Sequence, residues 1–449
     1  MKKFLLIVFL IPVVIFCCKK DEEKDNAIKD DPRVRSMSIS GISTTFVVND
    51  AEGLIFNYDS ISYGTAINKL RPAFSGYGEA LSFQYRYDGD PVWKEYTNQD
   101  TLDFSSVRVF FKAIAPDPVY TKEYQIAVRV HKYDVEAFTW YEKGTLIPVQ
   151  GKVISQKAIL YNNKYYFFYC NNLGESYLLT SDAFKLTSEA PEDENSWIDK
   201  GKIDIDNPDW ATLTSMYTPN ILAVQAAGKI YRCDLTEGEI SFLPDDAVLP
   251  ENYTLHAPLF TLKNSFWIIV KQESTYRLCS LPEGEKIYKE GVVLPSGVQF
   301  ENITTFVAPS GSAIIGYIFG EKHVNGNDGA VWGVDVSGNV MQLTSDRSVF
   351  SFRSYPMPFL FENRLCIFGG LKSDGYYSGE FFNSPNSGAT WSKDTHKILP
   401  VKIGMAKGSI FEYERNKLII IGGESKEGFL PNVWKGTLNQ EILNGLIYN

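Results

Sequence analysis

Asn416-Lys417-Leu418-Ile419-Ile420-Ile421 is a short polar turn that leads into an apolar strand, and it is the last of six such segments. The other five are Asn162-Asn163-Lys164-Tyr165-Tyr166-Phe167-Phe168, Gly228-Lys229-Ile230-Tyr231, Asn264-Ser265-Phe266-Trp267-Ile268-Ile269, Gly311-Ser312-Ala313-Ile314-Ile315 and Asn363-Arg364-Leu365-Cys366-Ile367-Phe368. Their spacing averages about 50 residues, the length of one four-stranded propeller blade. Since no segment has helical periodicity, the repeat predicts a six-bladed β-propeller over residues 135–449. A stack of unrelated sandwiches is the alternative.

Two of the six units carry a double glycine directly after the apolar strand. These are Leu365-Cys366-Ile367-Phe368-Gly369-Gly370 and Leu418-Ile419-Ile420-Ile421-Gly422-Gly423, and a tryptophan follows each of them, Trp391 and Trp434. Glycine permits a positive φ and a close approach of the backbone, as a strand end that turns sharply in a crowded place requires. The pattern resembles the kelch repeat, which implies a kelch-like propeller.

A third motif lies between the two double glycines. The stretch Ser384-Pro385-Asn386-Ser387-Gly388-Ala389-Thr390-Trp391 resembles the Asp-box hairpin of sialidase-like propellers, with Asn386 in place of the usual aspartate. Asp boxes lie on the outer edge of a blade, far from the axis. The resemblance therefore implies a structural role for Asn386, Gly388 and Trp391.

The ends of the repeat region carry a further signal. A propeller hides the edges of its first and last blades by letting one end of the repeat region add a strand to the blade at the other end. Phe138-Thr139-Trp140-Tyr141, with the Leu-Ile-Pro-Val run that follows it, is similar to Ala389-Thr390-Trp391-Ser392. We therefore expect residues 138–149 to supply the outer strand of the last blade, beside residues 433–436.

The amino terminus is typical of a bacterial lipoprotein signal. Lys2 and Lys3 precede an apolar run over residues 4–16, which is shorter than the ~20 residues that a membrane-spanning helix needs. The peptidase that cleaves such signals requires a small residue before the lipidated cysteine, which favours Cys18, preceded by Cys17, over Cys17, preceded by Phe16. We predict a signal peptide over residues 1–17 and lipidation of Cys18. An ordinary signal peptide or a short inner-membrane anchor is the alternative.

A charged run follows the predicted lipidation site. It comprises Lys19, Lys20, Asp21, Glu22 and Glu23. The run resembles the export signal of surface lipoproteins of the Bacteroidetes, which implies an outer-membrane lipoprotein exposed at the cell surface. A short run of mixed charges is also compatible with a plain solvated tether, here residues 18–33.

Residues 34–133 show six strand-like segments within about 100 residues, at 36–40, 45–48, 54–58, 81–85, 107–111 and 124–130. The last of them alternates apolar and polar side chains. Strand number and spacing predict an immunoglobulin-like β-sandwich, although the Cys-Trp-Cys core of immunoglobulin domains is absent. The whole chain is therefore predicted to be all-β. The arrangement resembles lipoproteins of gut Bacteroides that join a small sandwich to a kelch-like propeller.

The composition restricts the partners. The chain has 449 residues, 44% of them hydrophobic, and a formal net charge of −10 without a basic stripe, which argues against nucleic acid as a partner. Cys170, Cys233, Cys279 and Cys366 lie in apolar runs of different units, so we expect buried thiols rather than disulfides. The four histidines lack metal-ligand spacing. No metal and no cofactor are predicted.

The sequence lacks the residues that two enzymatic activities of similar propellers require. A sialidase needs an arginine triad and usually several Asp boxes, and a kelch-type copper oxidase needs two histidine ligands beside a tyrosine and a cysteine. Glycoside hydrolysis needs only two nearby carboxylates, which 54 acidic residues neither exclude nor locate. No catalytic residue is predicted, and a glycan-active enzyme, a glycoside hydrolase or sialidase-like, is the alternative function.

The favoured function is binding of a glycan or of an outer-membrane protein by the propeller, with the membrane reached through the lipid anchor. Aromatic side chains such as Trp210, Trp332, Tyr376 and Tyr377 are candidates for stacking on sugar rings. A carboxylate pair facing the central pocket would favour the enzyme, and a pocket without one would favour binding.

Overall fold

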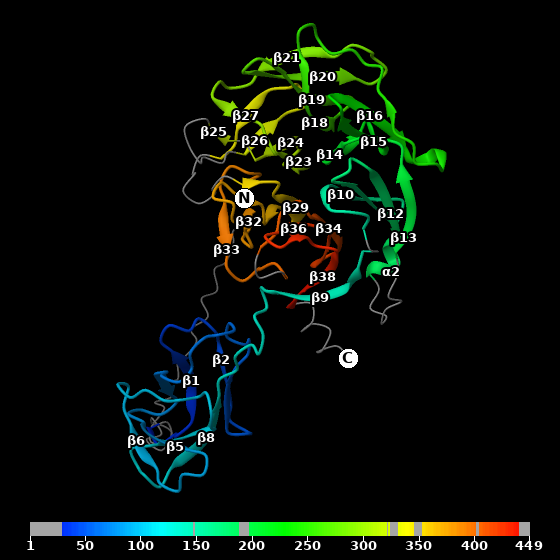
Figure 1. The fold of residues 1–449 in the computed structure, drawn as a ribbon. Helices are drawn as coiled ribbons and strands as arrows, with labels where there is room; N and C mark the ends of the chain where they lie inside the picture. The colour runs from blue at the N-terminus through cyan, green and yellow to red at the C-terminus, as the bar shows by residue number, and fades with distance from the viewer. Residues whose placement is uncertain are drawn as a thin grey trace, which may run out of the picture. The chain divides into compact units, whose positions relative to one another are not determined.

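The computed structural model describes residues 29–146, 149–187, 197–320, 322–323, 331–344, 353–400 and 404–439. The predicted signal peptide, Cys18 and the charged run Lys19 to Glu23 lie outside the described residues. The chain divides into two compact units, Met1–Val135 and Glu136–Asn449. Strands make up most of both units (Figure 1). No helix within the described ranges has the length and hydrophobicity needed to cross a membrane.

The first unit consists of two antiparallel-rich sheets. A two-stranded sheet pairs β1 (Val34–Ile39) with β4 (Pro72–Gly76). A six-stranded sheet has the order β2 (Phe46–Asn49), β3 (Leu54–Asn57), β8 (Thr121–Ala127), β7 (Val109–Ile114), β5 (Ser82–Tyr87) and β6 (Lys94–Tyr96), with β3 and β8 parallel. One apolar cluster joins side chains of both sheets, among them Val34, Ile55 and Phe111.

Two strands of the first unit were not expected from the sequence. β4 contains a proline and a glycine, and β6 is the short polar segment Lys94–Tyr96, so neither has the alternation that identifies a strand. Tertiary contacts form both strands. Phe74 of β4 stacks on Phe83 at 4.8 Å between ring centroids, and the Tyr96 hydroxyl of β6 donates a hydrogen bond to the carbonyl of Pro72.

In the second unit, the described residues form six four-stranded antiparallel sheets. Their strands are, in hydrogen-bonded order: β10 (Val153–Tyr161), β11 (Lys164–Asn171), β12 (Ser176–Asp182), β13 (Trp197–Ile203); β14 (Pro208–Met216), β15 (Thr218–Ala226), β16 (Lys229–Asp234), β17 (Leu243–Pro244); β18 (Thr254–Leu262), β19 (Ser265–Gln272), β20 (Thr275–Pro282), β21 (Lys289–Val293); β23 (Thr304–Ser310), β24 (Ala313–Phe319), β26 (Trp332–Val334), β27 (Val340–Gln342); β29 (Met357–Phe361), β30 (Arg364–Phe368), β32 (Phe381–Ser384), β33 (Ser392–Asp394); and β34 (Ser409–Glu414), β35 (Lys417–Ile421), β38 (Asn432–Leu438), β9 (Phe138–Thr145).

Shorter elements connect these sheets. They are α2 (Ala183–Thr187), the 3-10 turn η1 (Leu235–Glu237), and three two-stranded ribbons that pair β22 (Val298–Gln299) with β25 (Lys322–His323), β28 (Arg353–Ser354) with β31 (Leu371–Lys372), and β36 (Glu424–Ser425) with β37 (Gly428–Phe429).

The six sheets form a closed ring (Figure 1). The first strands contact one another in the order β10, β14, β18, β23, β29 and β34, and β34 returns to β10. An apolar cluster fills each junction between consecutive sheets, including the junction between the last sheet and the first. The hydrophobic core is therefore divided among six interfaces between sheets.

This division explains why the strongest sequence signal is a continuous apolar run. In β35, Leu418 and Ile420 pack in the cluster shared with the preceding sheet, whereas Ile419 and Ile421 pack in the cluster shared with the first sheet. Successive side chains of a strand point to opposite faces, so a strand covered on both faces buries every residue. All four of these side chains are fully buried.

The last sheet obtains its fourth strand from the beginning of the second unit. β9 pairs antiparallel with β38, with Trp140 opposite Gly436, Tyr141 opposite Lys435 and Thr145 opposite Asn432. β9 ends at Thr145, and the Leu146 backbone N–H that follows donates to the carbonyl of Pro431. Residues 147–148 of the expected strand lie outside the described residues. The sheet that closes the ring is therefore built from residues about 300 positions apart in the chain.

Trp140 anchors this closing strand. Its indole Nε1 donates a hydrogen bond of 2.8 Å to the carbonyl of Ile398, and its ring packs against Phe138 and Phe368. Gly436 lies directly below the ring, where a Cβ would approach the indole to 2.5 Å. The neighbouring Tyr141 points to the other face and is 53% exposed.

The Trp140→Ala substitution is expected to destabilise the second unit by roughly 3 kcal/mol, because it removes an aromatic anchor and a hydrogen bond from the closing strand. Tyr141→Ala, in the same strand, is expected to change stability by less than about 0.5 kcal/mol. Urea denaturation of both variants measures the difference. Equal losses would show that Trp140 does not hold the closing strand.

Candidate functional site: the central cavity

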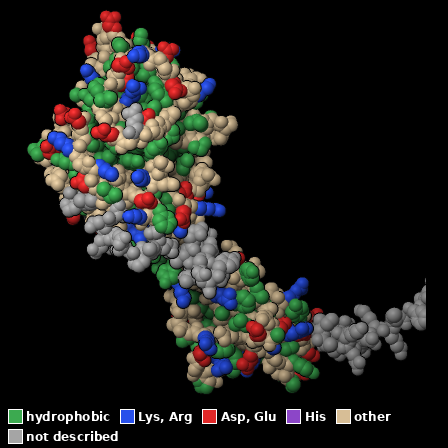
Figure 2. Space-filling view, turned by 90° about the vertical axis from the view of Figure 1, so that its right-hand side faces the viewer, with side chains coloured by type: hydrophobic (Ala, Val, Ile, Leu, Met, Phe, Trp, Pro, Cys, Tyr) green, Lys and Arg blue, Asp and Glu red, His purple; other side chains and the backbone are tan. Residues whose placement is uncertain are grey.

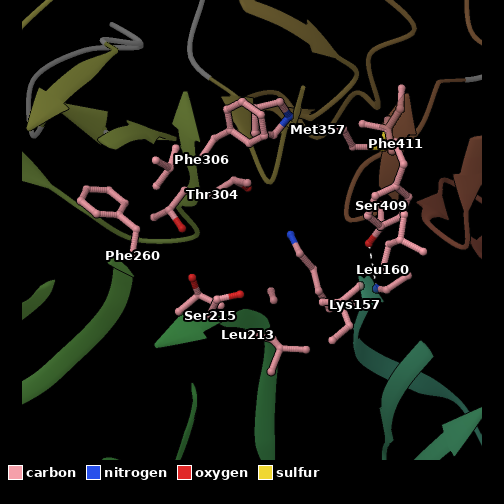
Figure 3. Close-up of a pocket in the computed structure, with 18 of the residues that line it drawn as sticks. Lys157, Leu160, Leu213, Ser215, Phe260, Thr304, Phe306, Met357, Ser409 and Phe411 are labelled. Atoms are coloured by element: carbon pink, nitrogen blue, oxygen red, sulfur yellow. Dashed lines mark hydrogen bonds between the residues drawn. The ribbon is translucent and has the colours of Figure 1, made fainter. Parts of the chain in front are cut away.

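A hollow in the second unit lies inside the ring of first strands. It has a volume of about 650 Å³, within the range of small-molecule pockets. Each of the six first strands contributes to its wall, for example through Ala158, Leu213, Phe260, Phe306, Met357 and Phe411. Figure 3 shows Leu213, Phe306, Met357 and Phe411 on different sides of a common space. A site at this position is thus assembled from all six sheets.

The wall combines apolar and hydroxyl-bearing side chains. Phe306 and Phe411 provide aromatic surface, and Thr214, Ser215 and Thr304 provide hydroxyl groups, whereas Phe260 is 2% exposed and packs between the third and fourth sheets. Among the described residues that line the cavity, none is an aspartate or a glutamate. The described wall therefore offers no carboxylate for general acid or base catalysis.

Several other hydroxyls at the ring centre connect neighbouring first strands. Ser155 of β10 donates to Asp209 of β14 and accepts from the Ala211 backbone N–H. Thr261 of β18 donates to the Ser215 carbonyl and accepts from the Tyr217 N–H. These bonds satisfy backbone groups at the inner edge of each sheet, which has no partner strand there.

The same device continues around the ring. Thr305 of β23 donates 2.8 Å to the Leu259 carbonyl of β18, and Ser409 of β34 accepts 2.8 Å from the Ala158 N–H of β10. The Gln156 side chain of β10 also exchanges two hydrogen bonds with the Gly423 backbone of the last sheet. The wall is therefore held by bonds that cross four of the junctions between first strands.

Three lysines line the cavity, Lys157, Lys263 and Lys407, and Lys157 projects into its middle. Figure 3 shows its side chain leaving β10 and ending in the middle of the space. Burial lowers the pKa of Lys157, and the negative charge of Asp209 opposes part of that effect. The Asp209 carboxylate itself accepts from Ser155 and from the Ala211 N–H, so its hydrogen bonds are made with β10 and its own strand.

The end of the cavity at which the strands begin is more polar. Lys407, just before β34, forms a 2.6 Å ion pair with Glu424, and Glu424 also accepts a 2.6 Å hydrogen bond from the Tyr377 hydroxyl. The Lys407 ammonium lies over the ring of Tyr355, whose hydroxyl donates to Asn302. Burial raises the pKa of Tyr355 and of Tyr377, so both phenols are neutral donors at physiological pH.

A second hollow of about 340 Å³ adjoins this end and shares Tyr355 with the cavity. His256 and Asn302 contribute to it. The His256 Nε2 is 2.7 Å from the carbonyl of Phe300, which requires a proton on that nitrogen. Burial lowers the pKa of His256, which keeps the ring neutral. The His256 ring is therefore occupied by its hydrogen bond to Phe300 and by its contact with the Tyr276 ring.

The face of the second unit seen in Figure 2 is not strongly charged. Figure 2 shows acidic, basic and apolar side chains interspersed over the visible face of the second unit. Such a mixed surface does not single out a highly charged macromolecule as partner.

The double glycines occupy strand ends where a side chain would collide. Gly369 has φ +66°, and a Cβ there would lie 2.2 Å from the Met405 carbonyl oxygen; Gly423 has φ +129°, and a Cβ would lie 2.4 Å from the Met405 Cε. Gly370 and Gly422 also have positive φ and close neighbours. These glycines lie at the ends of the second strands, where they let neighbouring backbone and side-chain atoms approach closely.

Gly369 and Gly370 also accommodate a buried arginine. Arg353 is 1% exposed and donates to the Gly369 carbonyl and to Glu380, whose carboxylate additionally binds Lys372 at 3.0 Å and Lys393 at 2.9 Å. Burial of Glu380 would raise its pKa, but hydrogen bonds from Lys393, Lys372 and Ser378, together with the charge of Arg353, lower the pKa to about 2.

This network makes a prediction about pH. Because the folded-state pKa of Glu380 is below its ordinary value of 4.5, its contribution is complete above pH 4.5 and is lost as pH falls toward 2. A shift from 4.5 to about 2 corresponds to at most about 3 kcal/mol.

Urea denaturation between pH 6 and pH 2 tests this. Glu380→Gln should be less stable than wild type at pH 6, and the gap should narrow as the pH falls. Glu427→Gln, at an exposed carboxylate, is the control. A gap that does not depend on pH would contradict the assigned charge network.

The Asp-box-like hairpin is engaged in local and inter-sheet bonds. The Asn386 Oδ1 accepts from the Thr390 N–H at 2.8 Å, and the Gly388 N–H donates to Ser384. Trp391 is buried, and its indole donates to the Gly388 carbonyl. Trp434 packs with the cluster between the last two sheets. None of these motif residues lines the central cavity described above.

The suggestion that Trp210 and Trp332 stack on sugar rings was wrong. Trp210 is 0% and Trp332 5% exposed, because both pack in clusters between neighbouring sheets. Tyr377 is bonded to Glu424, and Tyr376 is exposed outside the cavity. The aromatic residues of the cavity wall are instead phenylalanines of the first strands, together with Tyr217 and Tyr355 beside them.

The prediction of buried thiols is confirmed for all four described cysteines, which are buried and form no disulfide. Burial raises the pKa of Cys279 to about 11 and also raises the pKa of Cys366. Within the described ranges, no three His, Cys, Asp or Glu side chains are grouped closely enough to bind a metal ion together.

Sequence reasoning did not find Lys157. It lies in Ile154-Ser155-Gln156-Lys157-Ala158-Ile159-Leu160, a first strand whose polar residues are mixed with apolar ones. The repeat was recognised from the second strands, which are the most apolar. The cavity wall is formed by the first strand of each sheet, which precedes the recognised segment. A polar residue in the middle of such a strand is the signal that would have located the wall.

Comparison with family models identifies the class. The model of the DUF6242 beta propeller domain matches residues 316–444, so the second unit contains a β-propeller. The model for the N-terminal domain of DUF6242, a domain of unknown function, matches residues 16–128. The chain carries both the N-terminal domain and the propeller domain of DUF6242. No match was found among the curated proteins.

Three solved structures match about two thirds of the chain at low sequence identity. The structure of YjhT is 14% identical, with 65% of this chain and 96% of that chain covered at a TM-score of 0.42. A calcium-binding regucalcin of Agrobacterium tumefaciens is 8% identical, with 67% and 93% covered at 0.40. SapL1 lectin, solved with alpha methyl fucoside, is 9% identical, with 63% and 95% covered at 0.42.

Proposed function

We propose that the chain is a lipid-anchored outer-membrane protein, exposed at the cell surface, whose propeller binds a glycan or an envelope protein without transforming it. In this proposal the six four-stranded sheets are the six blades of a kelch-like propeller, and the first unit is an immunoglobulin-like sandwich that acts as a spacer. Support for the blades comes from the closed order of the first strands and from the six apolar junctions between sheets.

The central cavity carries the binding proposal. It is lined by all six sheets, and its described wall has aromatic and hydroxyl groups but no carboxylate. Aromatic rings bury the apolar faces of sugars, while hydroxyl side chains bond to sugar hydroxyls. Hydrolysis of a glycosidic bond would instead require a pair of carboxylates about 5–10 Å apart.

A combined screen tests this function. The chain from Lys19 to Asn449 contains both compact units and can be applied to a glycan array and, in parallel, incubated with host and plant polysaccharides. We expect saturable binding to a restricted set of glycans and no release of product. Product release would contradict a binding function and favour the glycan-active enzyme.

Silence in both assays would contradict glycan recognition and leave the envelope protein as the ligand. Chemical cross-linking on intact cells, followed by identification of the captured outer-membrane protein, is then the decisive measurement. A chain carrying Trp140→Ala serves as the control, since its closing strand is weakened.

The lipid anchor makes a separate prediction. Cys18→Ala should abolish incorporation of a labelled fatty acid and leave the signal uncleaved, because it removes the acylated thiol. Cys17→Ala should retain both, since alanine is also small at the position before the cleavage site. Fatty-acid labelling in the native host measures both. Equal labelling of the Cys18→Ala chain would contradict the assignment.

A further inference from the structure

We infer that the central cavity binds a carboxylate-bearing glycan and that the Lys157 ammonium is the group that recognises the carboxylate. This inference rests on the proposed function, and it specifies the chemical class of the ligand and the residue that selects it.

The position of Lys157 is the first observation. Its side chain extends from β10 into the middle of the cavity, and its ammonium forms no hydrogen bond and no ion pair with another described residue (Figure 3). Lysine side chains at a protein surface normally place the charged end in bulk water. Here the charge is held inside a hollow, in the place that a bound ligand would occupy.

The charges around the cavity are the second observation. Lys407 also contributes to the wall, but its charge is engaged by Glu424 at 2.6 Å. The described wall contains no carboxylate, and Asp209 directs its hydrogen bonds to Ser155 and Ala211. Lys263 lines the cavity as well and forms no ion pair with a described residue, but it is exposed, whereas Lys157 is half-buried. Lys157 is therefore the half-buried cation of the described wall that is left without an ion pair.

The physical consequence concerns the ligand. A positive charge partly withdrawn from water is unfavourable unless an opposite charge accompanies it. A carboxylate that enters the cavity meets an ammonium in a medium less polar than water, where the attraction between unit charges is stronger. A neutral ligand of the same shape would displace water from the Lys157 ammonium and give it no opposite charge in return.

The remaining wall fits a hydroxylated body better than an acidic peptide. The hydroxyls of Thr214, Ser215 and Thr304 form no hydrogen bond with another described residue, unlike Thr261, Thr305 and Ser409, which bridge neighbouring strands. Phe306 and Phe411, both half-buried, add aromatic faces. Free hydroxyls, aromatic faces and a half-buried cation match a sugar acid, which has hydroxyls, an apolar ring face and a carboxylate.

The ammonium of Lys157 bonds to no described residue, so its removal does not break a contact of the fold. We therefore expect the Lys157→Gln chain to fold, with a melting temperature no lower than that of wild type. Lys157→Arg retains a positive charge at the same position. Lys164→Gln removes an exposed lysine from the neighbouring strand β11 and is the matched control.

Titration calorimetry with digalacturonate and with its neutral methyl ester tests the inference. Wild type should bind the acid at least about tenfold more tightly than the ester, since a charge-assisted hydrogen bond contributes that much. Lys157→Gln should abolish this preference and leave the affinity for the ester unchanged. Lys157→Arg and Lys164→Gln should retain the preference.

A second measurement locates the ligand. Digalacturonate should slow the reductive methylation of Lys157, measured by mass spectrometry of the peptides, without slowing that of Lys164. Binding that leaves Lys157 equally reactive would place the ligand elsewhere and overturn the assignment.

The outcomes separate the two proposals. Equal affinity for acid and ester, or glycan-array hits confined to neutral sugars, would overturn the role of Lys157 while the proposed glycan binding stands. Binding of an acidic tripeptide in place of digalacturonate would overturn the sugar class. Absence of binding to every glycan would overturn the proposed glycan function and this inference with it.

Discussion

Closure of the ring is the constraint on which the second unit depends. Each sheet is apolar on both faces and so requires a neighbour on each side, which a linear stack cannot give to its first and last members. The chain meets this requirement when β9 completes the last sheet beside β38, and the cluster containing Phe167 and Ile419 seals the final junction. Once this junction has formed, every sheet packs on both faces against a neighbouring sheet through an apolar cluster.

Closure also creates the cavity. Six first strands brought together around a centre cannot pair with one another over their whole length, so their inner edges expose backbone groups. The hydroxyls of Ser155, Thr261, Thr305 and Ser409 satisfy several of these groups across the junctions. Side chains that hold the wall are thereby distinguished from those, such as Lys157, that face the space without a bond to it.

The parts of the fold that depend on local chemistry were predictable. The runs around Leu418 and Leu365 are apolar because their strands are covered on both faces, and Gly369 and Gly423 are required where a Cβ would collide. What depends on assembly was not predictable. Trp210 and Trp332 proved to be core residues, and β6 exists only because Tyr96 packs beneath the other sheet of the first unit. Lys157 has no motif around it, and its role follows only from the position that the ring gives it.

The motifs that resemble known families and the site that could define function therefore lie in different places. The double glycines, Asn386 and Trp391 hold sheets and hairpins together, and none of them reaches the cavity wall. Since the wall is stabilised by its own hydroxyl bridges and by the six junctions, the side chains that only face the space contribute little to folding. A charge such as that of Lys157 can be kept there at a modest cost in stability, and the ligand that neutralises it regains that cost on binding. Selectivity in such a propeller then resides in a few inward side chains, which stability and family resemblance do not reveal.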